Sequence, residues 1–174
     1  FLPLGRIVTA RPIGSEAGRH ELYDRRRAAG LAEARGDIIA ILEDRGHPRS
    51  DWARTVVRLH RETGRDVIGG AVDPAGPFLP LNWAFHVTDF GRYTRPFESG
   101  PRDWVSDVNI TYSRRALEAT RHLWRDRYQE PVVNWHLMGQ GMELWLDARL
   151  VVLHRRPPLR LGPLLRERFD WGRL

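Results

Sequence analysis

Two carboxylates and an arginine follow directly on an apolar run in this chain. Residues 38–42 are five consecutive apolar residues, and Glu43, Asp44 and Arg45 come next. An apolar run without polar alternation predicts a strand that is covered on both faces, as in a parallel sheet. Ligands of open α/β sheets bind outside the carboxyl ends of the strands, so Glu43 and Asp44 mark a candidate ligand-binding edge.

Glu130 and His154 are two further candidates for acid, base or ligand chemistry. Glu130 precedes Pro131 at the start of a predicted helix over 130–141, where the helix dipole stabilises a carboxylate and capping competes with catalysis as its role. His154 ends an apolar segment over 144–154, where a structural histidine is the commoner outcome. The local sequence alone fixes neither role.

The composition narrows the class of protein. The 174 residues fit one domain over 1–174, and roughly 70% of the unfolded surface of such a chain can be buried. Cysteine is absent, which excludes disulfides, thiolate zinc sites and cysteine nucleophiles and leaves His, Asp and Glu as metal ligands. The longest apolar runs are far shorter than the ~20 residues that span a bilayer. We therefore predict a cytoplasmic protein, with a peripheral contact at the inner face of the membrane as an open alternative.

All 28 basic residues are arginines, and the formal net charge is +6. Phosphate binding is one explanation of the count. A genome that encodes arginine wherever lysine would serve is the other, and the complete absence of lysine favours it. Acidic residues are scattered among the arginines, as in 20–27 and 123–130. A module that binds nucleic acid through a coherent basic face therefore ranks low among the alternatives.

Helix and strand signals alternate along the first half of the chain. In order, the sequence predicts a short strand over 6–10, a helix from its cap at Ser15 to Gly36, a strand over 38–42, a helix over 50–64 and a strand over 66–72. This alternation is typical of an α/β fold with a mainly parallel sheet.

The second half of the chain is less regular. Its predicted elements are a helix over 81–93, a strand over 104–112, a helix over 113–124 capped by Ser113, a helix over 130–141, strand segments over 144–154 and a basic amphipathic C-terminal helix over 157–174. Loops rich in proline and glycine lie on both sides of the first of these helices.

A series of short motifs runs through the chain from about residue 20. In order they are Arg27, Gly30, Ala34 and Gly36, "IIAIL", Glu43-Asp44-Arg45, Trp52, "VIGGAV", "SDVNITYSRRAL", Glu130 before "NWHLMGQG", and "VVLH" ending at His154. This series resembles the family-2 glycosyltransferases of the GT-A fold. The resemblance implies a three-layer α/β/α sandwich with a mainly parallel, mixed sheet. It also implies transfer of a sugar from a nucleotide diphosphate-sugar to an acceptor hydroxyl by an inverting single displacement.

The resemblance also assigns roles to individual residues. It places Arg27 and Glu43 on the nucleotide side of the site, and Asp44 and Arg45 beside the diphosphate. Glu130 becomes the general base that deprotonates the acceptor hydroxyl. The acceptor itself, whether a glycan, a lipid or a small molecule, is not specified by these motifs, and neither is the oligomeric state.

Asp107 and Asn109 complete the implied site, where they would line the sugar or acceptor pocket. Members of the family open with a strand-helix unit that supplies part of the nucleotide pocket, whereas one short strand precedes the helix of Arg27 here. We therefore expect the chain to be amino-terminally truncated relative to the working unit, with an exposed apolar edge or groove near 7–42. A degenerate domain that binds a sugar nucleotide or a partner without turnover is the main alternative.

Arg45 departs from the family's pattern, because it stands at the acidic position that usually holds a divalent cation. A guanidinium cannot bind a cation, but its permanent charge and planar fork can neutralise phosphate oxygens directly. The competing prediction is a Mn²⁺ or Mg²⁺ ion on Asp44, with His47 or His154 as a further ligand. Pairing of Arg45 with Glu43 or Asp44 is a third, purely structural role. We favour the arginine-assisted, weakly metal-dependent version.

Overall fold

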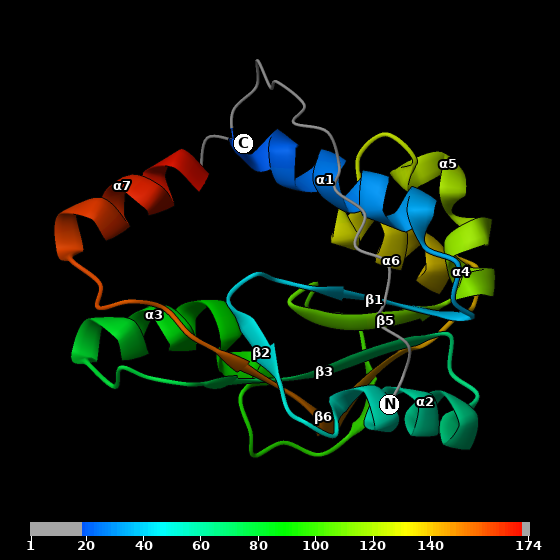
Figure 1. Cartoon of the computed structure of the whole chain (residues 1–174), viewed down its shortest axis with the longest axis horizontal. Coiled ribbons are helices and arrows are strands. Elements are labelled where there is room, and N and C mark those ends of the chain that lie inside the picture. The colour runs from blue at the N-terminus through cyan, green and yellow to red at the C-terminus, as the bar shows by residue number, and fades with distance from the viewer. Residues whose placement is uncertain (1–18, 172–174) are drawn as a thin grey trace.

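The computed structural model describes residues 19–171, which form a mixed α/β fold with seven α-helices and one six-stranded sheet in that range (Figure 1). The strands are β1 (Ile38–Leu42), β2 (Gly46–Pro48), β3 (Val67–Pro74), β4 (Gly100–Arg102), β5 (Asn109–Ser113) and β6 (Leu144–His154). The helices are α1 (Arg19–Glu33), α2 (Trp52–Thr63), α3 (Pro80–Phe90), α4 (Arg114–Ala119), α5 (Arg121–Trp124), α6 (Glu130–Gly139) and α7 (Leu161–Trp171), with a 3₁₀ turn at Gly91–Tyr93. The strand predicted over 6–10 and the cap predicted at Ser15 lie outside the described residues.

The sheet has the strand order β1-β5-β3-β6-β2, and β4 pairs with β6 beside this path. β3 and β6 are parallel, whereas the other four pairings of the described strands are antiparallel. The expectation of a mainly parallel sheet is therefore wrong. A long segment separates β3 from β5, so the chain can reverse its direction before β5 enters between β1 and β3.

β1 has the predicted bounds but a different environment. Ile39 and Ile41 are buried, whereas Ala40 between them is exposed. Successive strand side chains point to opposite faces, so one face of β1 is well covered and the other is not. Within residues 19–171 β1 pairs with β5 alone, which makes it an edge strand of the described sheet.

Helices pack on both faces of the sheet. Figure 1 shows α1, α4, α5 and α6 gathered on one side and α2 on the other. Val67 belongs to the core cluster that includes Leu31 of α1 and Leu137 of α6, while the next residue, Ile68, packs with Leu59 of α2. Adjacent residues of β3 therefore pack into two different cores, because successive side chains of a strand point to opposite faces of the sheet.

Local signals explain several element boundaries. Gly64 ends α2 in the left-handed conformation with φ 63°, and its N–H donates to His60 O. The hydroxyl of Ser113 accepts a hydrogen bond from the N–H of Ala116 at the start of α4, as predicted. Pro131 lies in the first turn of α6, where its missing N–H costs no helical hydrogen bond.

α7 is shorter than predicted, because it begins at Leu161 after the prolines 157 and 158. Both nitrogens of the Arg168 fork bind Asp89 of α3, at 2.8 and 3.0 Å. Asn82 of α3 donates to Pro157 O and accepts from Leu159 N. α7 and the segment before it are therefore tied to α3. Within residues 19–171 no helix is both long enough and apolar enough to cross a membrane.

Candidate functional site

Three charged side chains from different elements lie beside the end of β1. Arg27 comes from α1, Asp107 from the segment that leads into β5, and Glu130 from the first turn of α6. Arg27 Nη1 is 2.5 Å from Asp107 Oδ2. Burial raises the pKa of Asp107, and the Arg27 guanidinium opposes this rise. Arg27 therefore partly offsets the effect of burial on the pKa of Asp107, which remains raised.

Glu130 is the carboxylate with the most perturbed environment in this group. Burial, followed by the negative charge of Asp107, raises its pKa to about 7, although a hydrogen bond from Asn134 and the charge of Arg27 act in the opposite direction. A carboxylate that titrates near neutral pH can accept a proton and release it again. The same position at a helix N-terminus would by itself favour the ionised form, so burial outweighs the helix dipole here.

Two buried tyrosines belong to the hydrogen-bond network of Asn134, whose side chain binds Glu130. Asn134 Nδ2 donates to Glu130, and Asn134 Oδ1 accepts from the Tyr112 hydroxyl at 2.8 Å. The Tyr112 and Tyr128 hydroxyls are also 2.8 Å apart. Burial raises the pKa of both tyrosines well above the usual value, so both remain protonated donors. Sequence analysis did not predict this series of hydrogen bonds, because no spacing pattern relates residues from a strand, a loop and a helix.

Glu43 and His154 meet where β1 and β6 end. His154 Nε2 lies 3.4 Å from Glu43 Oε2, and the His154 side chain is only 3% exposed. Burial tends to raise the pKa of Glu43, but the contact with His154 and the charges of Arg45 and Arg27 together outweigh it and lower the pKa. Glu43 is therefore ionised at neutral pH.

Arg27 is the common neighbour of these carboxylates. Its positive charge lowers the pKa of Glu43, Asp107 and Glu130. The structure thus brings together four of the residues that sequence analysis singled out, and it does so on one side of the β1–β5 pair, in which Leu42 lies opposite Asn109.

Asp44 and Arg45 lie on the turn between β1 and β2, and His47 lies in β2. All three border an open groove of about 740 Å³. The turn is closed by the N–H of Gly46 bonding to Glu43 O, and Arg155 N donates to Arg45 O across the groove floor. The groove is lined by Asp44, Arg45, His47, Ala75, Gly76, Pro77, Phe78, Arg155, Arg156, Pro157 and Pro158. Three arginines therefore border one groove, together with a single carboxylate.

The predicted metal ligands line two neighbouring cavities. Asp44 and His47 border the open groove, whereas His154 lines a neighbouring pocket and contacts Glu43. Within the described part of the chain, no cluster of three or more His, Asp or Glu side chains could hold a metal ion. A cation on Asp44 and His154 therefore stays a prediction.

Asn109 is fully buried, and it lines neither the groove nor the pocket that adjoins it. Its Nδ2 donates to the carbonyl oxygens of Ala71 and Leu150, both at 2.9 Å, and its Oδ1 accepts from Trp52 Nε1 at 3.0 Å. The β3–β6 register shifts between Gly70 and Ala71. Asn109 satisfies carbonyl groups at this irregularity, so its amide has a structural role.

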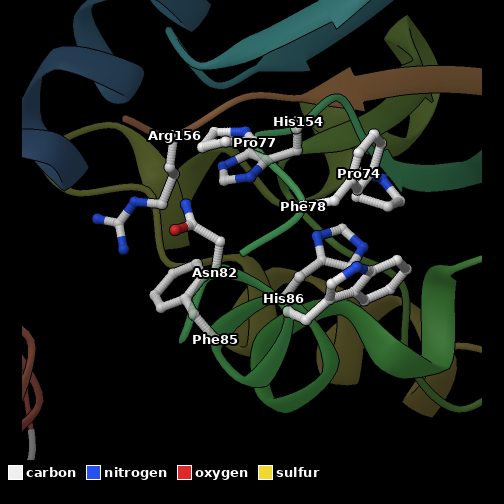
Figure 2. Close-up of a pocket in the computed structure, with 10 residues that line it drawn as sticks. Pro74, Pro77, Phe78, Asn82, Phe85, His86, His154 and Arg156 are labelled. Carbon is white, nitrogen blue, oxygen red and sulfur yellow. The ribbon is translucent and has the colours of Figure 1, made fainter. Parts of the chain in front are cut away.

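A smaller, deeper pocket adjoins the groove (Figure 2). It is lined by Pro74, Gly76, Pro77, Phe78, Asn82, Trp83, Phe85, His86, His154 and Arg156. Figure 2 shows Arg156, Asn82 and Phe85 grouped at one end and Pro74 at the other. Burial, followed by the charge of His154, lowers the pKa of His86, which is therefore neutral at pH 7. The pocket and the groove share four lining residues, Gly76, Pro77, Phe78 and Arg156, so the two cavities adjoin each other.

Comparison with known proteins identifies no family for this chain: no protein-family model matches it, and a search of curated proteins finds no matching relative.

Proposed function

We propose that this chain is a glycosyltransferase domain that moves a sugar from a nucleotide diphosphate-sugar to an acceptor hydroxyl with inversion. The observation that carries the proposal is the pKa of about 7 at Glu130, next to the Arg27–Asp107 pair. A general base is most effective when its pKa lies near the working pH. The arginine-lined groove beyond Glu43 provides the second requirement, a place for a phosphorylated leaving group.

Each group has a defined part in the proposed step. Glu130 removes the proton from the acceptor hydroxyl while the hydroxyl oxygen bonds to the anomeric carbon of the donor. The bond between that carbon and the diphosphate breaks, and its electron pair leaves with the diphosphate. Arg45 and Arg155 border the groove and would stabilise the charge that develops there. Asp107 keeps Arg27 in place beside the base.

The proposal also includes the type of fold. We propose that the six-stranded sheet with helices on both faces is the GT-A-like three-layer sandwich that the sequence motifs imply. Its support is the position of Glu43, which directly follows a strand and lies among the charged residues of the candidate site. The GT-A assignment also agrees with helices packing against both faces.

Substitution of the proposed base tests the function. The full chain would be assayed for sugar transfer with a panel of nucleotide diphosphate-sugars and saccharide acceptors. We expect Glu130→Gln to lower turnover by about 10²–10⁴ and to leave donor binding nearly unchanged, because the amide keeps the shape and loses the base. Glu33→Gln, at an exposed position of α1, is the matched control. An unchanged rate in Glu130→Gln would remove Glu130 from the mechanism.

A non-catalytic domain that binds sugar nucleotides is the second candidate. Arg45 favours it, because an arginine replaces a residue that the implied catalytic pattern uses for a cation. Binding of a nucleotide diphosphate-sugar without transfer or sugar release across the whole panel would support this candidate. Binding to nucleic acid ranks lower, since arginines of the helices pair with acids of their own helix, as in Arg25–Glu21 and Arg58–Glu62.

A further inference from the structure

Nitrogen atoms without hydrogen-bond partners lie in the wall of the pocket in Figure 2. Arg156 Nε and Nη1 are buried, and neither has a hydrogen-bond partner in the described structure, whereas His154 Nε2 faces Glu43 Oε2 at 3.4 Å. The Arg156 side chain is 10% exposed, and its remaining nitrogen, Nη2, binds Glu167 at 2.8 Å. Buried donors are almost always satisfied in native proteins, so two such atoms on one residue of the pocket indicate a place for an oxygen-bearing ligand group.

The mouth of this pocket is aromatic. Phe78 is 64% exposed and Trp83 is 40% exposed. Their ring centroids lie 6.0 Å apart, with 31° between the ring planes. Large aromatic side chains at this exposure form a flat apolar surface that water covers poorly, and such a surface suits the C–H face of a sugar ring.

We propose that the pocket is an acceptor subsite for a carbohydrate ring. The ring stacks on Trp83 beside Phe78, and one of its substituent oxygens enters the pocket to accept hydrogen bonds from Arg156. The inference rests on the proposed function, because it places the subsite next to the groove that would hold the diphosphate.

The shape of the pocket favours the acceptor over the donor sugar. In the proposed step a donor sugar would lie between its diphosphate and Glu130, whereas Phe78 and Trp83 are exposed and leave room for further sugar units. The enclosed space is small, about 20 Å³, which matches a single oxygen-bearing group and not a whole ring. The acceptor is therefore inferred to be a saccharide.

The indole N–H of Trp83 provides a direct probe. The ¹⁵N-labelled full chain would be titrated with methyl glucoside, methyl galactoside, methyl mannoside and glucuronate, first alone and then with saturating uridine or guanosine diphosphate. We expect at least one sugar to shift the Trp83 indole signal, and to do so with the diphosphate bound. Stronger, salt-dependent binding of glucuronate would identify a carboxylate as the entering group, whereas equal binding of a methyl glycoside would identify a hydroxyl.

A pair of variants provides the control. Trp83→Leu should weaken sugar binding roughly tenfold, measured on the remaining signals of the pocket. Trp135→Leu removes a more exposed indole from α6 and should leave binding unchanged. No shift at Trp83 with any of the four sugars, or sugar binding that the diphosphate abolishes, would overturn the acceptor subsite. Diphosphate binding that persists in the same titration would leave the proposed function standing.

Discussion

The side chain of Asn109 occupies the space in which a Cβ atom of Gly70 would have to lie. A Cβ built on Gly70 overlaps Asn109 Nδ2 and the carbonyl oxygen of Leu150, which accepts a hydrogen bond from that same amide. Gly70 and Asn109 therefore depend on each other across β3 and β5. The glycine is required by this close approach and not by an unusual φ angle.

Gly70→Ala should be strongly destabilising, because the added methyl group must displace backbone or break the hydrogen bonds of Asn109. We expect the free energy of unfolding to fall by about 1–3 kcal/mol or more, as measured by urea denaturation. Gly30→Ala is the control, since a Cβ at Gly30 meets no neighbouring atom and α1 would gain helix propensity of up to about 1 kcal/mol. Equal stability of the two variants would contradict this account.

Removal of the charge at Arg27 should raise the pKa of Glu130 above about 7, because the guanidinium lowers that pKa in the parent chain. Arg27→Gln is the test, and the side-chain carboxyl signal of Glu130 in a ¹³C NMR titration is the measurement. In an active enzyme the acidic limb of the pH–rate profile should move to higher pH. Arg25→Gln changes an arginine of the same helix that pairs with Glu21, and it should leave the titration of Glu130 unchanged.

The raised pKa of Glu130 should also make the stability of the protein depend on pH. The folded chain holds a proton on Glu130 up to about pH 7, whereas the unfolded chain loses it near the ordinary value of 4.5. The free energy of unfolding should therefore fall as the pH rises from about 4.5 to about 7, because the folded state binds more protons in that window. Glutamine does not titrate, so Glu130→Gln should not lose stability in this way as the pH rises. The free energy of unfolding of Glu130→Gln minus that of the parent should therefore be larger at pH 8 than at pH 4.5.

Urea denaturation of both proteins at the two pH values measures this difference. Glu33→Gln, on the exposed side of α1, controls for the general loss of a negative charge. A stability difference between Glu130→Gln and the parent that stays constant from pH 4.5 to pH 8 would mean that the Glu130 carboxyl is not perturbed.

Arg45 should bind a nucleotide diphosphate in the open groove without the help of a metal ion. We expect uridine or guanosine diphosphate to bind the parent chain in the presence of chelator, with affinity that falls as salt is added. Arg45→Ala should weaken this binding by about tenfold or more, as measured by calorimetry. Arg49→Ala removes an exposed arginine that lies near Asp51 instead, and should have little effect. Binding that requires manganese and survives Arg45→Ala would show that a cation, and not the guanidinium, holds the diphosphate.

Local features of the chain could be predicted well from the sequence. The bounds of β1 follow from its continuous apolar residues, and the ends of α2 and α4 follow from Gly64 and Ser113, which act on the backbone within a few residues of themselves. The carboxylate at the end of β1 was also predicted, because position relative to a strand end is a local property.

Non-local features could not be predicted in the same way. Nothing in residues 109–113 indicates that β5 runs antiparallel to both neighbours, since strand direction is set by how the preceding segment folds back. Asn109 was assigned to a pocket, although its amide is needed for the carbonyl groups of Ala71 and Leu150. The Tyr112–Tyr128 contact likewise depends on tertiary packing that no short sequence pattern encodes.

The ties between α3 and α7 have a mechanical consequence. Asn82 hydrogen-bonds the segment before α7, the Asp89 carboxylate holds the Arg168 fork, and Phe85 lies between the guanidinium groups of Arg156 and Arg168, at 4.1 and 4.6 Å. These contacts join α3, which borders the pocket, to α7 and to the segment before it. A shift of α3 at the pocket must therefore either move α7 with it or break these contacts.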